Sequence, residues 1–150
     1  MIWRDFEAAA PELAAAGVER FARTGLVLVG TLRRDGWPRI SPVEIMIVDG
    51  HLYLGMTWQS KKALDLVRDP RCVVHSTVSQ LDGSEGDFKV YGRADAITDL
   101  EMRSRFADAV YERLQFRPEG EYHLFSIDIE SVGFVEFKDD RLVPAVWKAP

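Results

Sequence analysis

The sequence predicts a mainly β protein of the α+β class, an antiparallel β-barrel with helices at its periphery. Apolar runs of strand length recur along the chain, and turn signals separate them. Two turns contain an Asp-Gly pair, Asp35-Gly36 and Asp49-Gly50, which favours hairpins because glycine readily adopts a positive φ. Gly92, inside a predicted strand, indicates a bend. About seven or eight strands joined mostly by hairpins indicate a closed antiparallel sheet.

The composition is that of one ordinary globular domain covering residues 1–150. The chain is 47% hydrophobic and 29% charged, and its length is sufficient for a single buried core. Its net charge of −5 argues against a non-specific nucleic-acid binder, which usually has a basic face.

The single cysteine and the N-terminus predict the cellular location. Cys72 is alone, so no internal disulfide can form, and a reducing compartment is expected. Residues 1–5 lack the basic region and apolar run of a signal peptide. No apolar stretch approaches the roughly 20 residues that a membrane span requires. We therefore expect a cytoplasmic protein that binds neither nucleic acid nor membrane.

The first 24 residues are expected to form two helices, because alanine and leucine are abundant there. Pro11 suits the first turn of the second helix. Leu13, Val18 and Phe21 form its apolar stripe, and Gly25 occupies the position of a C-terminal cap. This helix is expected to cover an open end of the sheet.

Three strands follow, over Leu26–Leu32, Arg39–Val48 and His51–Thr57. The second contains Pro42, which removes a backbone donor from the ladder. Pro42 therefore indicates an edge, a bulge, or a backbone that faces a ligand instead of a neighbouring strand.

A short helix is predicted over Ser60–Asp69, with Ser60 as its N-cap. Lys61 and Lys62 occupy its first turn, where the helix dipole disfavours cations. Free amides, a hydroxyl and two ammonium groups at one helix start form a phosphate site, unless the lysines are simply solvated surface residues. The residues expected to face the core are Ala63, Leu64 and Val67.

Further strands are predicted over residues 71–79, 87–97, 121–130, 131–138 and 142–148. Thr98 and Glu101 form a capping box before a helix that ends near Leu114. That helix is expected to bury Met102, Phe106, Val110 and Leu114. Cys72 is interpreted as a small buried residue, and His75 as a paired strand histidine instead of a metal ligand.

Five segments together resemble the pyridoxamine 5′-phosphate oxidase-like split-barrel flavoproteins. They are Gly36–Val43, Asp49–Leu54, Ser60–Lys62, Arg68–Arg71 and Val90–Ala94, and the similarity extends over most of residues 20–138. The resemblance implies a six-stranded antiparallel Greek-key split barrel. It also implies a homodimer that binds flavin mononucleotide (FMN), or a deazaflavin in some branches, at the subunit interface.

The resemblance assigns the cofactor-binding residues. The family's Ser-x-Lys motif is matched by Ser60 and Lys62, with Lys61 between them, and implies contacts to the cofactor phosphate. The second-strand segment matches the backbone that lines the isoalloxazine ring, and the end of the third strand matches the stretch over the ribityl chain. These two segments are Ser41, Pro42, Val43 and Glu44, and Gly55, Met56 and Thr57.

Departures from the family pattern argue against a vitamin B6 oxidase. Those oxidases carry an arginine and a lysine on the second strand, where this chain has Ser41 and Glu44–Met46. Glu44 is expected to face solvent or an amide, because it would repel a phosphate. The basic C-terminal segment of those oxidases has no match in Trp147–Pro150.

The functional hypothesis is an FMN-dependent oxidoreductase acting on an unknown small molecule. The alternatives are a deazaflavin-dependent reductase of the same fold, for which Arg39, Lys61, Lys62 and Arg71 offer a basic rim, and a non-catalytic flavin or haem binder. No catalytic side chain is nominated, because no triad, carboxylate pair or metal cluster has recognisable spacing. Trp58, Tyr91 and Trp147 either shape a substrate pocket or pack in the core or an interface. Phe134, Val135 and Phe137 fit a dimer interface.

Overall fold

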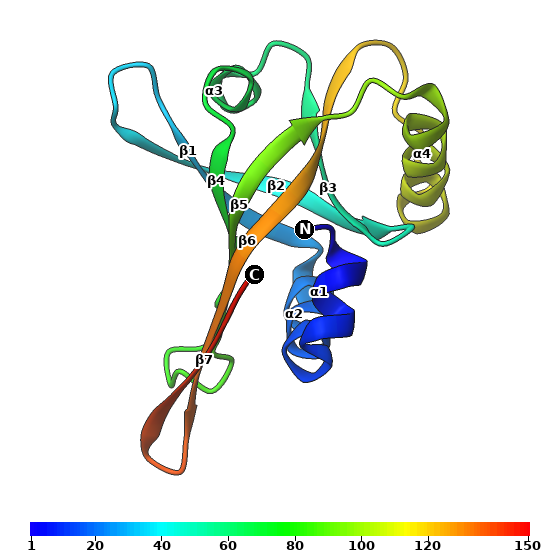
Figure 1. The fold of residues 1–150 in the computed structure, drawn as a ribbon. Helices are drawn as coiled ribbons and strands as arrows, with labels where there is room; N and C mark the ends of the chain where they lie inside the picture. The colour runs from blue at the N-terminus through cyan, green and yellow to red at the C-terminus, as the bar shows by residue number, and fades with distance from the viewer.

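The computed structural model describes residues 1–150 as seven strands and four helices (Figure 1). The helices are α1 (Trp3–Ala9), α2 (Pro11–Thr24), α3 (Lys61–Arg68) and α4 (Leu100–Leu114). The strands are β1 (Leu26–Leu32), β2 (Pro38–Val48), β3 (His51–Thr57), β4 (Arg71–Ser76), β5 (Asp87–Ala96), β6 (Tyr122–Lys138) and β7 (Arg141–Lys148).

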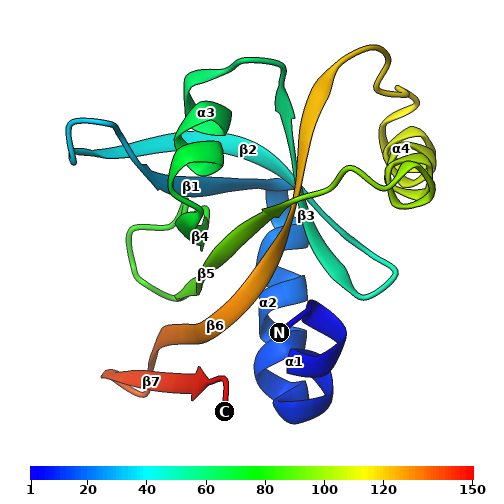
Figure 2. The same ribbon diagram turned by 45° about the horizontal axis from the view of Figure 1, so that its top comes forward.

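Six of the strands form the predicted closed antiparallel barrel. They lie in the order β3-β2-β1-β4-β5-β6, and pairing of β3 with β6 closes the sheet. β4 pairs with β1 instead of β3, which is a Greek-key connection, and α3 lies in that crossover. The four helices lie outside the strands, as Figures 1 and 2 show. The prediction of a six-stranded split barrel with peripheral helices is confirmed.

The two prolines of β2 lie on a half-strand that has only one neighbour. Residues 38–44 pair with β1, whereas only residues 45–48 pair with β3. Pro38 and Pro42 therefore lie where β2 has a free edge, which is the position at which a strand tolerates a missing N–H. Of the three readings of Pro42, the edge is the one that the pairing supports.

The core fills the barrel and extends beneath it to α1 and α2. Phe21 of α2 stacks edge-on against Phe88 with ring centroids 5.4 Å apart, and Trp3 packs on Phe6 at 5.2 Å. A Cβ on Gly17 would lie 2.5 Å from the Phe88 ring, so this helical glycine permits close approach of α2 to the barrel. The first helices therefore cover one end of the sheet, as expected.

A smaller apolar cluster lies under α4, outside the barrel. Phe106 and Val110 of α4 pack against Tyr53 and Leu124 of the sheet. Leu114, predicted to be buried with them, is 45% exposed. The N-cap of α4 is Asp99, whose carboxylate accepts from the Met102 amide, and not Thr98 of the predicted capping box.

The buried face of α3 also differs from the prediction. Ala63 and Leu66 are buried, whereas Leu64 and Val67 are 41% and 60% exposed. Asp65, which lies between Leu64 and Leu66 in the sequence, is also buried. The helix is therefore rotated so that an acidic side chain, not an apolar one, occupies part of its inner face.

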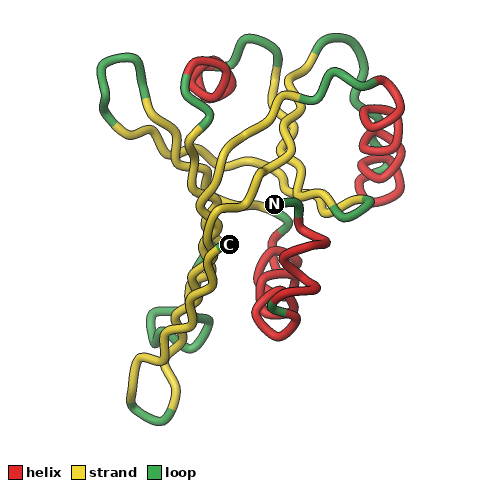
Figure 3. The backbone as a smooth tube through the Cα atoms, in the orientation of Figure 1, coloured by secondary structure: helices red, strands yellow, loops and turns green.

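Strand β6 is one continuous strand of 17 residues, not the two segments predicted. Its first part belongs to the barrel. Residues 131–135 pair with both β5 and β7, and residues 136–138 pair with β7 alone in an arm that projects beyond the barrel (Figures 1 and 3). Gly92 of β5 lies at a register shift opposite β6, and a Cβ there would lie 2.2 Å from the Asp128 carbonyl oxygen. The predicted bend at Gly92 is confirmed. No helix is long and apolar enough to cross a membrane.

Candidate functional site

The fold brings the predicted phosphate residues next to the second strand. Strand β3 ends at Thr57, and a tight turn with Gln59 at φ 57° leads directly into α3. The Lys62 ammonium donates to the Pro42 carbonyl oxygen at 3.4 Å. Lys62 thus connects the start of α3 with the segment of β2 that the family resemblance assigns to the flavin ring.

Ser60 carries the feature that points most directly to a ligand. It is the N-cap of α3, but its hydroxyl caps no amide of the helix. The Ser60 Oγ atom is buried and has no hydrogen-bond partner, which is costly for a polar group inside a protein. No acidic residue lies in the first turn of α3. A phosphate group fits here, because its oxygens would satisfy the hydroxyl and the free amides of the first turn.

A cationic hollow of about 480 Å³ lies beside this helix start, between the β1–β2 hairpin and α3. Its lining residues are all polar: Arg33, Arg34, Asp35, Arg39, Lys61, Asp65 and Arg68. Arg34 and Lys61 form no ion pair, and Arg33 pairs with the exposed Asp35. Arg71, predicted to join a basic rim, instead pairs with Asp69 at 2.6 Å and does not line the hollow.

Asp65 organises the floor of the cationic hollow. Its carboxylate accepts from Arg39 at 2.6 Å and from the Thr31 hydroxyl at 3.0 Å. Burial alone raises the pKa of Asp65, but the hydrogen bonds from Arg39 and Thr31 outweigh it and hold the pKa below its usual value. The carboxylate therefore stays ionised and fixes the direction of the Arg39 guanidinium.

The predicted ring-lining segment alternates between the two faces of β2. Val43 is buried in the core, whereas Pro42 and Glu44 face outward and are exposed. On β3, Met56 is likewise buried, while Thr57 is exposed. Val43 and Met56 therefore offer backbone, not side chain, to the outer surface, and the expected exposure of Glu44 is confirmed.

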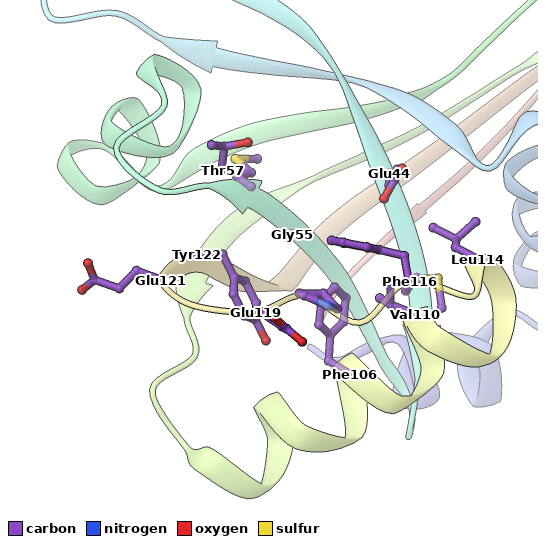
Figure 4. Close-up of a pocket in the computed structure, with 13 residues that line it drawn as sticks. Glu44, Gly55, Thr57, Phe106, Val110, Leu114, Phe116, Glu119, Glu121 and Tyr122 are labelled. Atoms are coloured by element: carbon purple, nitrogen blue, oxygen red, sulfur yellow. The ribbon is translucent and has the colours of Figure 1, made fainter.

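Four predicted cofactor residues line a second depression, which we call the acidic–aromatic pocket (Figure 4). It has a volume of about 360 Å³ and 13 lining residues. Glu44, Gly55, Met56 and Thr57 contribute from the sheet. The opposite wall consists of α4 and the segment that follows it: Phe106, Val110, Leu114, Phe116, Pro118, Glu119, Glu121 and Tyr122. Gly55 allows this wall to approach, because a Cβ would lie 3.0 Å from the Phe106 ring.

Trp58 lies at the end of β3 and stacks on His123 of β6. Their ring centroids are 4.5 Å apart and their planes differ by 15°. Burial lowers the pKa of His123, and the charge of Arg103 lowers it further. The His123 Nε2 atom is buried without a partner.

The other singled-out aromatic and histidine residues take ordinary positions. Trp147 packs on Phe6 with ring centroids 5.0 Å apart, so Trp147 belongs to the core and does not shape a substrate pocket. Tyr91 is 47% exposed on the outer face of the sheet. His51 contacts the Ser126 hydroxyl at 2.9 Å, and His75 contacts the Ser76 carbonyl oxygen at 2.6 Å. No group of three metal-ligating side chains converges anywhere in the structure.

Sequence reasoning missed the opposite wall of the pocket and most of the cationic hollow. Arg33, Arg34 and Arg68 were not predicted to bind the cofactor, although the paired arginines of the β1–β2 turn are visible in the sequence. Glu119 lies far along the chain from Gly55, so no local pattern relates the two.

Comparisons with solved structures give matches of low sequence identity. A nimc/nima family protein from Clostridium acetobutylicum matches with a TM-score of 0.69 and 14% identity, over 89% of this chain and 91% of that one. A heme binding protein from Mycobacterium smegmatis matches at 0.66 and 18%, over 87% of this chain and 57% of that one. The heme storage protein HutZ from Vibrio cholerae matches at 0.64 and 15%, over 81% and 89%. At such identities the likeness establishes the fold alone.

The chain thus spans little more than half of the mycobacterial protein's length. Comparison with curated protein sequences gave no match. The family model described as pyridoxamine 5′-phosphate oxidase, in contrast, matches residues 13–136. This match covers the barrel from α2 to the arm of β6, including every residue of the candidate site. The chain therefore belongs to the pyridoxamine 5′-phosphate oxidase family.

Proposed function

We propose that this protein is an FMN-dependent oxidoreductase that acts on a small organic molecule. The observation that carries the proposal is the buried, unpartnered hydroxyl of Ser60 at the start of α3, next to two lysines and no acid. Bound FMN would supply the hydride-transfer chemistry. The residues of this chain would hold the cofactor, orient it and exclude water.

Each part of the site has a separate task. Ser60 Oγ, the first-turn amides of α3 and the Lys61 and Lys62 ammonium groups bind the phosphate. The backbone of Ser41–Glu44 and of Gly55–Thr57 orients the ring system. Lys62 is held toward this backbone by its contact with Pro42, so phosphate and ring are positioned by adjoining parts of the fold.

A homodimer would complete the site. Leu28, Ile40 and Pro42 share the outer face of the sheet, because Leu28 pairs with Pro42 and Gly30 with Ile40. Ile40 is 71% exposed and Leu28 37%, so this face is apolar and uncovered in one chain. A second copy seated there would also cover the cofactor backbone at Pro42. Sedimentation velocity checks this proposal, and a single species of 17.0 kDa would contradict it.

Titration with FMN and riboflavin tests the phosphate site. Lys62→Ala should weaken FMN binding by about 1–3 kcal/mol, as for the loss of a charge-assisted hydrogen bond. Riboflavin lacks the phosphate, so its affinity should not change. Flavin fluorescence quenching measures both affinities.

Lys148→Ala is the matched control, because it removes an exposed lysine from β7 and should leave both affinities unchanged. Equal loss of FMN and riboflavin affinity in Lys62→Ala would count against a phosphate contact, as would an unchanged affinity for FMN.

A deazaflavin-dependent reductase is the second candidate, and the cationic hollow favours it. Lys61 belongs to both the phosphate site and the hollow, so an acidic tail extending from the phosphate would meet Arg33, Arg34 and Arg68. The absorption spectrum of the purified protein and titrations with both cofactors discriminate the candidates. A Soret band would instead support haem binding, the property after which two of the structural neighbours are named.

A further inference from the structure

The acidic–aromatic pocket has a charge pattern opposite to that of the phosphate site. Glu44, Glu119 and Glu121 are among its lining residues, and no lysine, arginine or histidine is. None of the three carboxylates forms an ion pair or accepts a hydrogen bond within the chain. Figure 4 shows Glu119 beside the rings of Phe106 and Tyr122, Glu44 on the sheet side near Phe116, and Glu121 directed away from them.

Aromatic rings complete the recognition surface. Phe106 of α4 is buried against Gly55, and Phe116 of the following segment is the more open of the two rings (Figure 4). Ring faces attract cations, most strongly where water is excluded. Phe116 is 60% exposed, so a ligand can still gain contact with its ring. Carboxylates close to aromatic faces form a site for an ammonium group attached to an apolar body.

Two arginines lie near this pocket, and neither forms an ion pair within it. Arg103 lies over the Tyr122 ring at 4.2 Å, and its guanidinium donates to the carbonyl oxygens of Ile97 and Tyr122. Arg113 donates to the Ile45 carbonyl oxygen in an adjacent smaller hollow, which Glu44 also lines. Neither pairs with a pocket carboxylate, so Glu44 and Glu119 remain available to a ligand.

We propose that the acidic–aromatic pocket binds an organic cation, a small amine or quaternary ammonium compound with an aromatic or branched apolar body. Its volume suits a ligand of this size. As a substrate assignment the inference rests on the proposed function, because Glu44 and Gly55–Thr57 line this pocket and also belong to the predicted ring site. Phosphorylated or carboxylated substrates are disfavoured by the same carboxylates.

Three probes of similar shape test the charge preference: phenyltrimethylammonium, its uncharged isostere tert-butylbenzene, and the anion phenylphosphonate. Binding is measured by calorimetry and by amide chemical shifts, with FMN absent and at saturation. The ammonium probe should bind at least tenfold more tightly than tert-butylbenzene, shifting residues of β3 and α4, and phenylphosphonate should not bind. The preference should persist with FMN bound, because a substrate has to bind together with its cofactor.

The double variant Glu44→Gln/Glu119→Gln should lose at least tenfold in affinity for the ammonium probe. Glu112→Gln, an exposed position on α4 outside the pocket, is the control and should bind normally. Equal affinity for the charged and uncharged probes would overturn the proposal, as would unchanged affinity in the double variant or displacement of the probe by FMN. FMN titration of the same samples separates the two proposals: cation binding without FMN binding would reject only the proposed cofactor.

Discussion

The two depressions on this barrel differ in almost every chemical respect, although both adjoin the end of β3. The cationic hollow has no hydrophobic lining residue and carries five basic side chains. The acidic–aromatic pocket has no basic lining residue, three carboxylates and a largely apolar wall. Figure 2 shows why they are separate, with α3 and α4 on different sides of the barrel. The long-range field of the cationic hollow attracts the anionic end of a ligand, and the acidic–aromatic pocket attracts a cationic or apolar molecule.

The largest expected effect concerns the floor of the cationic hollow. Asp65→Ala would leave Arg39 and the buried Thr31 hydroxyl without their acceptor. Breaking a buried pair is costly, but Arg39 is partly exposed, so we expect a loss of about 2–3 kcal/mol in the free energy of unfolding. Urea denaturation measures it.

Asp35→Ala is the comparison variant, because it breaks the exposed Arg33–Asp35 pair of the same hollow. It should cost about 1 kcal/mol or less. Since the pKa of Asp65 is lowered in the folded state, its contribution is present above about pH 4, the usual carboxyl pKa. The contribution is lost as the pH falls through the lowered pKa, so wild type and Asp65→Ala should converge in acid. Equal stability of the two proteins at pH 7 would contradict this role.

A smaller effect should follow from reversing one charge in each depression. Lys61→Glu should weaken FMN about tenfold, roughly 1.4 kcal/mol, and the loss should shrink at high salt because Lys61 is exposed. Glu119→Lys should change FMN affinity less than Lys61→Glu, because Glu119 belongs to the wall opposite the predicted ring site and does not line the cationic hollow beside the phosphate site. Similar FMN losses in both variants, measured by fluorescence titration, would show that the two regions do not act separately.

The smallest effect is a pH dependence at the edge of the acidic–aromatic pocket. Burial and Arg103 lower the pKa of His123 in the folded protein, so the unfolded chain takes up the proton first. Stability should therefore decrease as the pH falls through about 6.5, the ordinary histidine pKa. His123→Phe keeps a ring against Trp58 and should remove this step from the thermal unfolding profile. If the pH step persists in His123→Phe, another titrating group causes it.

The sequence predicts the barrel well because hairpin signals are local. The Asp-Gly turns and the glycine of β5 each act within a few residues, and each is where the sequence places it. The start of α3 was predictable for the same reason. Ser60 is its N-cap, although its hydroxyl caps no amide.

The predictions that failed for the buried faces of α3 and α4 depend on partners distant in the sequence. Asp65 is buried because Arg39 and Thr31 reach it from two strands, which displaces Leu64 and Val67 to the surface. Leu114 is exposed because the chain after α4 forms the wall of a pocket instead of covering the helix. No periodicity within α3 or α4 contains this information, since pairing across the fold decides it.

The prolines of β2 also bear on how this protein avoids aggregation. A free strand edge is a template for another chain to extend the sheet, and proline opposes such an addition because it has no N–H to donate. Pro38 and Pro42 lie on the half of β2 that pairs with β1 alone. Pairing of a strand from another chain with the edge near Lys62 is therefore disfavoured, and this edge stays accessible to a small molecule.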